Sequence, residues 1–117
     1  MKAIVCGGRD FKMMASLWAA LDALHEVRNF DLIITGGATG ADSMAHGWAM
    51  ERGVPVATYP AQWGRYGRKA GPLRNEWMLK LSGADTVIAF PGGNGTADMV
   101  RRGRAAVGVT VVELDGE

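Results

Sequence analysis

The chain has very little cysteine and no long hydrophobic run. Its 117 residues contain one cysteine, which cannot form an internal disulfide and which fits a reducing compartment. A run of about 18 apolar residues, the length needed for a membrane-spanning helix, is absent. CxxC and HExxH motifs are absent too. We therefore expect no disulfide framework, no contact with a membrane and no metal site built from protein ligands.

An excess of charge of one sign is also missing. Lysine and arginine number 13 and aspartate and glutamate 12, which gives a formal net charge of +1 at pH 7. This near-neutral balance argues mildly against a protein whose whole surface binds nucleic acid. The first residues enter a strand-like run directly, without an apolar leader or a cleavage site. We predict a cytoplasmic protein.

Glycine, in contrast, is abundant, and its position is informative. Three strand-like runs, KAIVC, DLIIT and DTVIA, lead into turns that contain a Gly-Gly pair. Glycine lets backbone amides approach a ligand, and a following helix N-terminus attracts anions. Since the carboxyl ends of parallel strands share one edge of a sheet, we expect the three turns to form one phosphate-binding crevice. The residues expected to contact the ligand are Gly7, Gly8, Arg9, Gly36, Gly37, Thr39, Gly40, Arg74, Asn75, Gly92, Gly93, Asn94, Gly95 and Thr96.

The alternation of strand-like and helix-like segments predicts the fold. It is an α/β, Rossmann-like three-layer sandwich: a five-stranded parallel sheet of order 3-2-1-4-5 with helices on both faces. Residues 1–117 form a single domain. The expected strands are 2–6, 31–35, 54–59, 86–90 and 109–114, and the expected helices are 12–27, 41–52, 72–82 and 96–107.

Several side chains are assigned to helix ends and helix faces. Asp10 is expected to cap the first helix, Thr39 and Asp42 to form a capping box, and Gly53 to end the second helix. The apolar stripes contain Met14, Leu17, Trp18, Leu21 and Leu24 in the first helix and Leu73, Trp77 and Leu81 in the third. Four tryptophans and seven methionines are many for one small sheet to cover. We therefore expect a homodimer or larger homo-oligomer, with Trp18, Trp48 or Trp77 at its interface.

The stretch 61–72 is expected to be an irregular loop that mixes aromatic and basic residues. Trp63 and Tyr66 are candidates for stacking on a nucleotide base. Arg74 follows in the first turn of a helix, where a positive charge is unfavourable, which suggests that it serves a ligand or a partner.

The motifs together resemble a known superfamily. PGGNGTAD is similar to the PGGxGTxxE signature of LOG-type phosphoribohydrolases, and GGATGADSMAHGWAMERG resembles the SGxxxGIDxxAHxxAL segment of DprA single-strand-binding proteins. The combination of GGRDF, GGATGAD, AGPLRNEWML and FPGGNGTADMVRRGRAA resembles most the YspA-type branch of the SLOG superfamily.

The resemblance implies a ligand of the nucleotide type, such as a nucleoside monophosphate, ADP-ribose or an NAD-like molecule. Cleavage of the N-glycosidic bond is an open possibility, because the glutamate of the LOG signature is replaced here by Met99. Asp98, one residue earlier, and Asp42 are the substitute catalytic candidates. Asp42 and His46, four apart on one helix face, are expected to form a local pair. No cofactor is expected to be required, although Mg²⁺ could accompany a bound diphosphate.

Two alternatives remain open. One is binding of single-stranded nucleic acid in the DprA manner, through Arg65, Arg68, Lys69, Arg101, Arg102 and Arg104. The other is an assembly subunit with a vestigial pocket. Cys6, at the end of the first strand, is expected to be a buried filler rather than a nucleophile.

Overall fold

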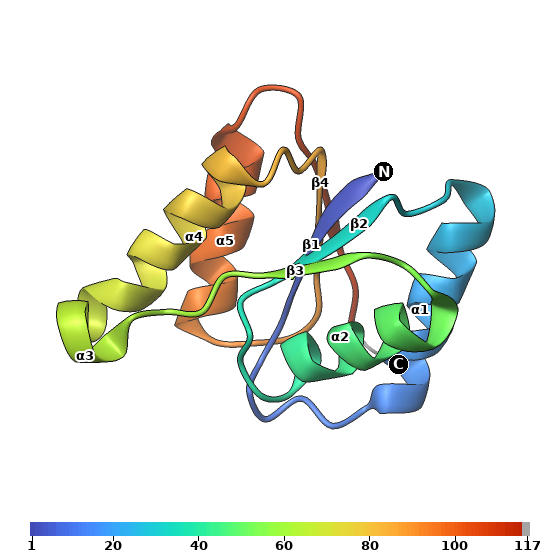
Figure 1. Ribbon diagram of the computed structural model, residues 1–117, viewed down its shortest axis with the longest axis horizontal. Helices are drawn as coiled ribbons and strands as arrows, with labels where there is room; N and C mark the ends of the chain where they lie inside the picture. The colour runs from blue at the N-terminus through green and yellow to red at the C-terminus, as the bar shows by residue number, and fades with distance from the viewer. Residues whose placement is uncertain (116–117) are drawn as a thin grey trace.

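A computed structural model describes residues 1–115 as one open α/β sandwich (Figure 1). Its elements, in chain order, are β1 (Lys2–Cys6), α1 (Met14–Val27), β2 (Leu32–Thr35), α2 (Ala41–Arg52), β3 (Val56–Thr58), α3 (Trp63–Tyr66), the 3-10 helix η1 (Gly67–Lys69), α4 (Ala70–Leu81), β4 (Thr86–Ala89), α5 (Asn94–Ala105) and β5 (Thr110–Glu113).

The sheet confirms the predicted topology. Its strands are all parallel and run in the order β3-β2-β1-β4-β5. The central strand β1 pairs with β2 on one side and with β4 on the other, for example Ala3 with Ile33 and with Thr86. Strands β2 and β3 extend the sheet on one side of β1, and β4 and β5 extend it on the other. The order of the strands therefore reverses between β1 and β4, which is where ligand crevices form in open α/β sheets.

Successive residues of the strands supply two separate cores, because side chains alternate between the faces of a strand. Ala3 and Val5 of β1 pack with α1 and α2, while Ile4 and Cys6 pack with α4 and α5. Figure 1 shows the two helix pairs on opposite sides of the sheet. Gly103 allows α5 to lie close to the sheet, because a Cβ atom there would be 3.0 Å from Val87 and from Val111. The predicted three-layer sandwich is confirmed.

Two of the expected helix caps are wrong. Helix α1 begins at Met14 with Met13 as its N-cap and no side-chain cap, so Asp10 does not cap it. Helix α2 follows Gly40, and neither Thr39 nor Asp42 caps it by a side-chain hydrogen bond. The Asp42 carboxylate binds the amides of the preceding turn instead, because that turn folds back over it. Gly53 does end α2 in the left-handed conformation, as predicted.

The stretch 61–72 is more ordered than expected. It forms α3 and η1, and α4 begins at Ala70, so that Pro72 lies in its first turn. The predicted stripe of α4 is wrong in detail. Asn75 and Met78 are buried, whereas Leu81 is 71% exposed because α4 turns its Asn75 side towards α5 and the sheet. Met14, at the start of α1, is 51% exposed and lies outside the core.

The tryptophans have different surroundings. Trp48 is fully buried, packs edge-on against His25 and Phe30, and donates through Nε1 to Asp22. It is therefore a core residue of this fold, and the prediction that Trp48 lies at an interface between subunits is wrong. Trp18 and Trp77 are half-buried. Within residues 1–115, the helices are all too short or too polar to cross a bilayer.

Candidate functional site

The carboxyl edge of the sheet contains a cavity of about 1070 Å³. The turns after β1, β2 and β4 all contribute to its wall, as the sequence predicts. The expected site residues that line it are Gly7, Gly8, Arg9, Gly36, Asp42, Trp63, Arg74, Asn75, Gly92, Gly93, Asn94, Gly95, Thr96 and Asp98. Four expected residues lie outside this lining: Gly37, Thr39, Gly40 and Tyr66.

Gly8 holds the three turns together. Its amide donates to the Pro91 carbonyl oxygen over 2.8 Å, and its own carbonyl oxygen accepts the Ala41 amide over 3.2 Å. A Cβ atom on Gly40 would lie 2.2 Å from the Gly8 carbonyl oxygen. Gly40 also has φ +74°, a conformation that favours glycine. Gly8 and Gly40 thus allow the turns to lie against each other. The Gly8 amide is bonded to Pro91 and is not free to bind a ligand.

In the turn between β2 and α2 the amides are occupied by a carboxylate. Oδ2 of Asp42 accepts the Gly36 amide over 3.0 Å and the Ala38 amide over 3.2 Å. Asp42 is only 6% exposed, and burial raises its pKa, against the lowering effects of these amides and of the Arg74 charge. The expected pair with His46 is not formed among residues 1–115, and His46 is exposed. These amides are thus not open to a ligand phosphate in this structure.

The turn between β4 and α5 differs, because its helix end is open. Helix α5 has Gly93 as its N-cap without any side-chain cap, and its first intrahelical bond runs from the Ala97 amide to Gly93. Within the described chain, the amides of Asn94, Gly95 and Thr96 therefore have no hydrogen-bond partner. A Cβ atom on Gly93 or Gly95 would meet no atom within 4 Å. This combination of free donors, open space and positive dipole end suits an anion.

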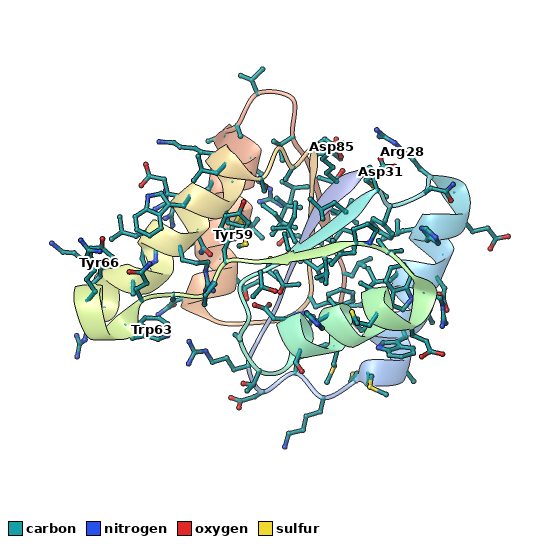
Figure 2. The ribbon with its side chains drawn as sticks, viewed as in Figure 1. Arg28, Asp31, Tyr59, Trp63, Tyr66 and Asp85 are labelled. Carbon is teal, nitrogen blue, oxygen red and sulfur yellow. The ribbon has the colours of Figure 1, made fainter. Side chains whose placement is uncertain are left out.

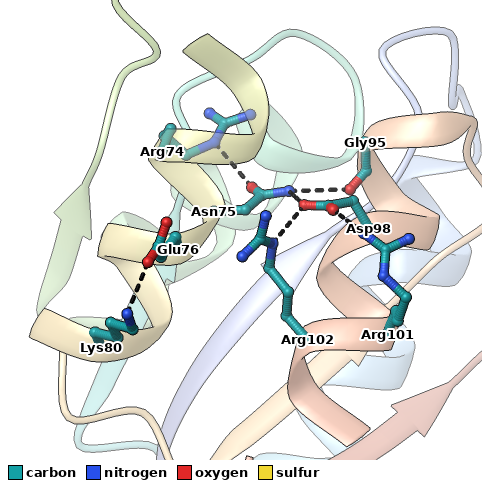
Figure 3. A network of polar contacts seen from close by, with 8 residues as sticks. All are labelled: Arg74, Asn75, Glu76, Lys80, Gly95, Asp98, Arg101 and Arg102. Carbon is teal, nitrogen blue, oxygen red and sulfur yellow. Dashed lines mark hydrogen bonds and ion pairs between the residues drawn. The ribbon is translucent and has the colours of Figure 1, made fainter. Parts of the chain in front are cut away.

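Asp98 is held by a network of donors (Figure 3). Its oxygens accept hydrogen bonds from Asn75 (3.0 Å), from Arg102 (2.8 Å) and from Arg101. Burial works to raise the pKa of Asp98, but the bonds from Asn75 and Arg102 and the two arginine charges outweigh it and lower the pKa. Asp98 is therefore an ionised, fully engaged carboxylate, which is a poor starting point for a general acid.

The neighbouring position of the LOG signature is closed to a ligand. Met99 is fully buried in the core between the sheet and α4 and α5. Arg74 is equally committed to the protein: its guanidinium donates to the Gly36 carbonyl oxygen over 2.7 Å and to the Asn75 side chain over 3.0 Å. A Cβ on Gly36 would lie 2.1 Å from Arg74, so Gly36 makes room for the guanidinium. Arg74 thus has a structural role beside any contact with a ligand.

Trp63 and Tyr66 both lie on α3, but they face different surroundings (Figure 2). The Trp63 ring lines the cavity, is 47% exposed and rests against Gly71, while the Arg9 guanidinium lies 5.2 Å from its centroid. Tyr66 packs edge-on against Trp77 at 5.9 Å. The geometry therefore retains only Trp63 as a candidate for base stacking.

The remaining candidates lie in less suitable surroundings. Burial raises the pKa of the Cys6 thiol to about 12, with the Asp42 charge adding to the effect, so Cys6 is unsuited to act as a nucleophile. Of the basic residues considered for nucleic-acid binding, Arg68 lines the cavity, whereas Arg101, Arg102 and Arg104 form ion pairs with acidic side chains. Residues 1–115 contain no cluster of three acidic, histidine or cysteine side chains that would hold a metal ion.

The cavity wall also includes residues that the sequence reasoning did not select. The segment after β1 remains non-helical as far as Met13, with a turn at Arg9 and Asp10, so Phe11, Lys12 and Met13 line the cavity. Gly71 and Pro72 enter the wall because α4 begins earlier than predicted. The run RDFKM directly after Gly7-Gly8 was the available signal, since it is a poor start for a helix.

Comparison with known proteins gives a consistent assignment. The family model described as "YspA, cpYpsA-related SLOG family" matches residues 1–66. The chain is also similar to the Gene 61 protein of Mycobacterium phage D29. The two are 36% identical over an alignment 121 residues long, which covers 97% of this chain and 95% of the phage protein. With the parallel sheet and the three glycine turns, these matches show that the chain belongs to the YspA, cpYpsA-related SLOG family.

Proposed function

We propose that this protein binds a phosphate-bearing nucleotide, of the nucleoside monophosphate, ADP-ribose or NAD-like type, in the cavity at the carboxyl edge of its sheet. The observation that carries the proposal is the open N-terminus of α5, where three unpaired amides and the uncrowded Gly93 and Gly95 face the cavity. Membership of the SLOG family is consistent with a nucleotide-related ligand. The volume of about 1070 Å³ accommodates a ligand of this size.

The phosphate is expected at the amides of α5, with the Thr96 hydroxyl beside it. Arg9, Lys12 and Arg68 line the same cavity and supply positive charge. Trp63 offers a face for the base once Arg9 moves to the phosphate. A diphosphate ligand would be able to bring Mg²⁺ with it, held mainly by its own oxygens.

We further propose that the protein binds its ligand without rapid cleavage of the N-glycosidic bond. Asp98 is occupied by three side-chain donors, and Met99 is sealed in the core. The test is to incubate the protein with AMP and to measure free adenine by chromatography. We expect no free adenine above the background measured without the protein. Fast release of adenine would contradict this part of the proposal.

Binding is tested by thermal shift and calorimetry with AMP, ADP-ribose, NAD and a single-stranded oligonucleotide. The variant Gly95→Val places a branched side chain over the α5 amides and should abolish binding of the nucleotides. Gly64→Val is the matched control. Gly64 also has open space around a Cβ, lies in the short helix α3 and does not line the cavity, so its variant should bind as the wild type does.

The two other functions give different results in the same experiment. Tight binding of the oligonucleotide alone would favour a nucleic-acid-binding protein, although three of its six expected arginine and lysine contacts are paired with acids. No binding of any of the four ligands would favour an assembly subunit with an unused pocket. Either outcome would overturn the nucleotide proposal.

A further inference from the structure

The Asp42 carboxylate occupies a part of the cavity that a phosphate cannot use. Asp42 lines the cavity and is more than nine-tenths buried. Its Oδ2 atom is fixed by the amides of Gly36 and Ala38, so the carboxylate cannot turn away. A negative charge held at this point repels phosphate oxygens and attracts hydrogen-bond donors. The part of a ligand that lies against Asp42 must therefore not be anionic and must carry hydrogen-bond donors.

The carboxylate has the capacity to accept such donors. An ionised carboxylate offers about four lone-pair positions on its two oxygens, and the protein uses one oxygen for two backbone amides. Backbone amides are fixed, so the geometry of Asp42 is set before a ligand arrives. Burial raises the pKa of Asp42, while the Ala38 amide and the positive charge of the Arg74 guanidinium, which lies against Gly36, oppose this rise and favour the ionised form.

The order of the strands places Asp42 between two other parts of the cavity. Asp42 follows β2, the open amides of α5 follow β4, and β1 lies between these strands. Neighbouring strands lie about 4.8 Å apart, so the ends of β2 and β4 are separated by roughly 10 Å. Trp63 follows β3, on the far side of β2. A nucleotide with its phosphate at α5 and its base at Trp63 would place its sugar in the middle, beside Asp42.

We infer that Asp42 accepts hydrogen bonds from the ribose hydroxyls of the bound nucleotide, and that the site thereby selects ribonucleotides over deoxyribonucleotides. This inference rests on the proposed function. It assigns the turn between β2 and α2 to the sugar rather than to the phosphate, in contrast to the expectation from its Gly-Gly sequence. It also gives Asp42 a binding role that requires no catalysis.

The experiment compares the dissociation constants of AMP, 2′-deoxy-AMP and 3′-deoxy-AMP by calorimetry. Loss of a hydrogen bond to a charged group costs about 1.5–3 kcal/mol, so each deoxy analogue should bind wild type about 10- to 150-fold more weakly than AMP. In Asp42→Asn, the amide oxygen still accepts the Gly36 and Ala38 amides, but the charge is gone. AMP should bind this variant more weakly, and the three ligands should differ by less than about threefold.

Glu51→Gln is the matched control, because it removes an exposed carboxylate from the same helix. It should keep the wild-type discrimination. The comparison of ligands on wild type needs no variant, so it decides the inference even if Asp42→Asn unfolds.

Two failures are distinguishable. If AMP binds, Gly95→Val abolishes the binding, and wild type does not discriminate against the deoxy analogues, the sugar assignment is overturned while the proposed function stands. If AMP does not bind wild type at all, the sugar assignment is overturned, and if ADP-ribose and NAD do not bind either, the proposed function is overturned with it.

Discussion

Asn75 on α4 donates from Nδ2 to the Asp98 carboxylate on α5 over 3.0 Å, and the same amide group reaches the Gly95 carbonyl oxygen over 3.1 Å. The Oδ1 atom of Asn75 accepts a bond from Arg74. A single buried side chain thus connects the first turn of α5 to α4 (Figure 3). Arg74 extends this chain of bonds to the Gly36 carbonyl oxygen in the turn after β2. This chain of bonds holds α4, the start of α5 and the turn after β2 in a fixed arrangement.

The first prediction concerns the stability that Asp98 supplies. Asp98→Asn should lower the free energy of unfolding at pH 7 by about 1–3 kcal/mol, because charge-assisted bonds to a buried carboxylate are lost. The pKa of Asp98 is lowered in the folded state, so its contribution is present above the ordinary aspartate pKa of about 3.9 and is lost as the pH falls through the folded value. Urea unfolding of both proteins at pH 7 and pH 3 measures the effect.

The difference between wild type and Asp98→Asn should therefore shrink at pH 3. Glu76→Gln on α4 removes the exposed pair with Lys80 and serves as the control, with a smaller loss at pH 7. An equal difference at the two pH values would show that the charge of Asp98 is not the stabilising feature.

A second prediction separates backbone strain from close contact. Gly40 and Gly53 both have φ near +70°, but a Cβ on Gly40 would lie 2.2 Å from the Gly8 carbonyl oxygen, while one on Gly53 would meet nothing within 4 Å. Gly53→Ala should cost about 1–2 kcal/mol of unfolding free energy, from the conformation alone. Gly40→Ala should cost clearly more, since two turns must move apart. Equal losses, measured by urea unfolding, would contradict the contact seen between the turns.

A third prediction concerns Cys6. Its thiol is buried and has its pKa raised to about 12, so almost no thiolate exists at pH 8. A disulfide reagent such as DTNB should modify the native protein only at the rate of its opening, and urea should speed the reaction by orders of magnitude. Stoichiometric labelling within seconds under native conditions would rule out this environment.

Salt provides a fourth test, which concerns the kind of ligand. A nucleotide held mainly by the backbone amides of α5 should lose little affinity between 50 and 200 mM salt. A long single strand that contacts many phosphates should lose about 10³-fold or more. Calorimetry with AMP across this range should give a change of less than about tenfold, and a steeper loss would point to many charge contacts instead.

Assembly is the subject of the fifth prediction. Leu81, the last residue of α4, is 71% exposed, and Val107, just after α5, is 101% exposed. Met50 on α2 is 65% exposed. The half-buried Trp18 and Trp77 add to the apolar side chains that a contact between copies would cover. We expect light scattering at micromolar concentration to give the mass of a dimer or larger oligomer. The mass of a monomer would contradict it.

Much of the fold follows from local features of the sequence. Strands β1, β2 and β4 are short apolar runs bounded by glycine or proline. Because parallel strands are joined by right-handed crossovers, few orders of the strands in the sheet are possible. The meeting of the three Gly-Gly turns at one edge follows from the same rules, because it depends only on strand direction. Gly53 at the end of α2 and the closeness of α5 at Gly103 were likewise predictable.

Which groups at that edge remain available was decided by the tertiary structure. Identical Gly-Gly pairs have different states: the Gly36 amide is taken by Asp42, the Gly8 amide by Pro91, and the amides at the start of α5 are open. Asp98 accepts a hydrogen bond from Asn75, which is 23 residues away, and Trp48 is fully buried, with its Nε1 bound to Asp22, 26 residues away. A hydrogen bond forms only where the donor–acceptor distance is correct to within a few tenths of an ångström, and the two groups are often far apart in the chain. Sequence periodicity determines which residues share a face, but only the packed structure determines which donors are left for a ligand.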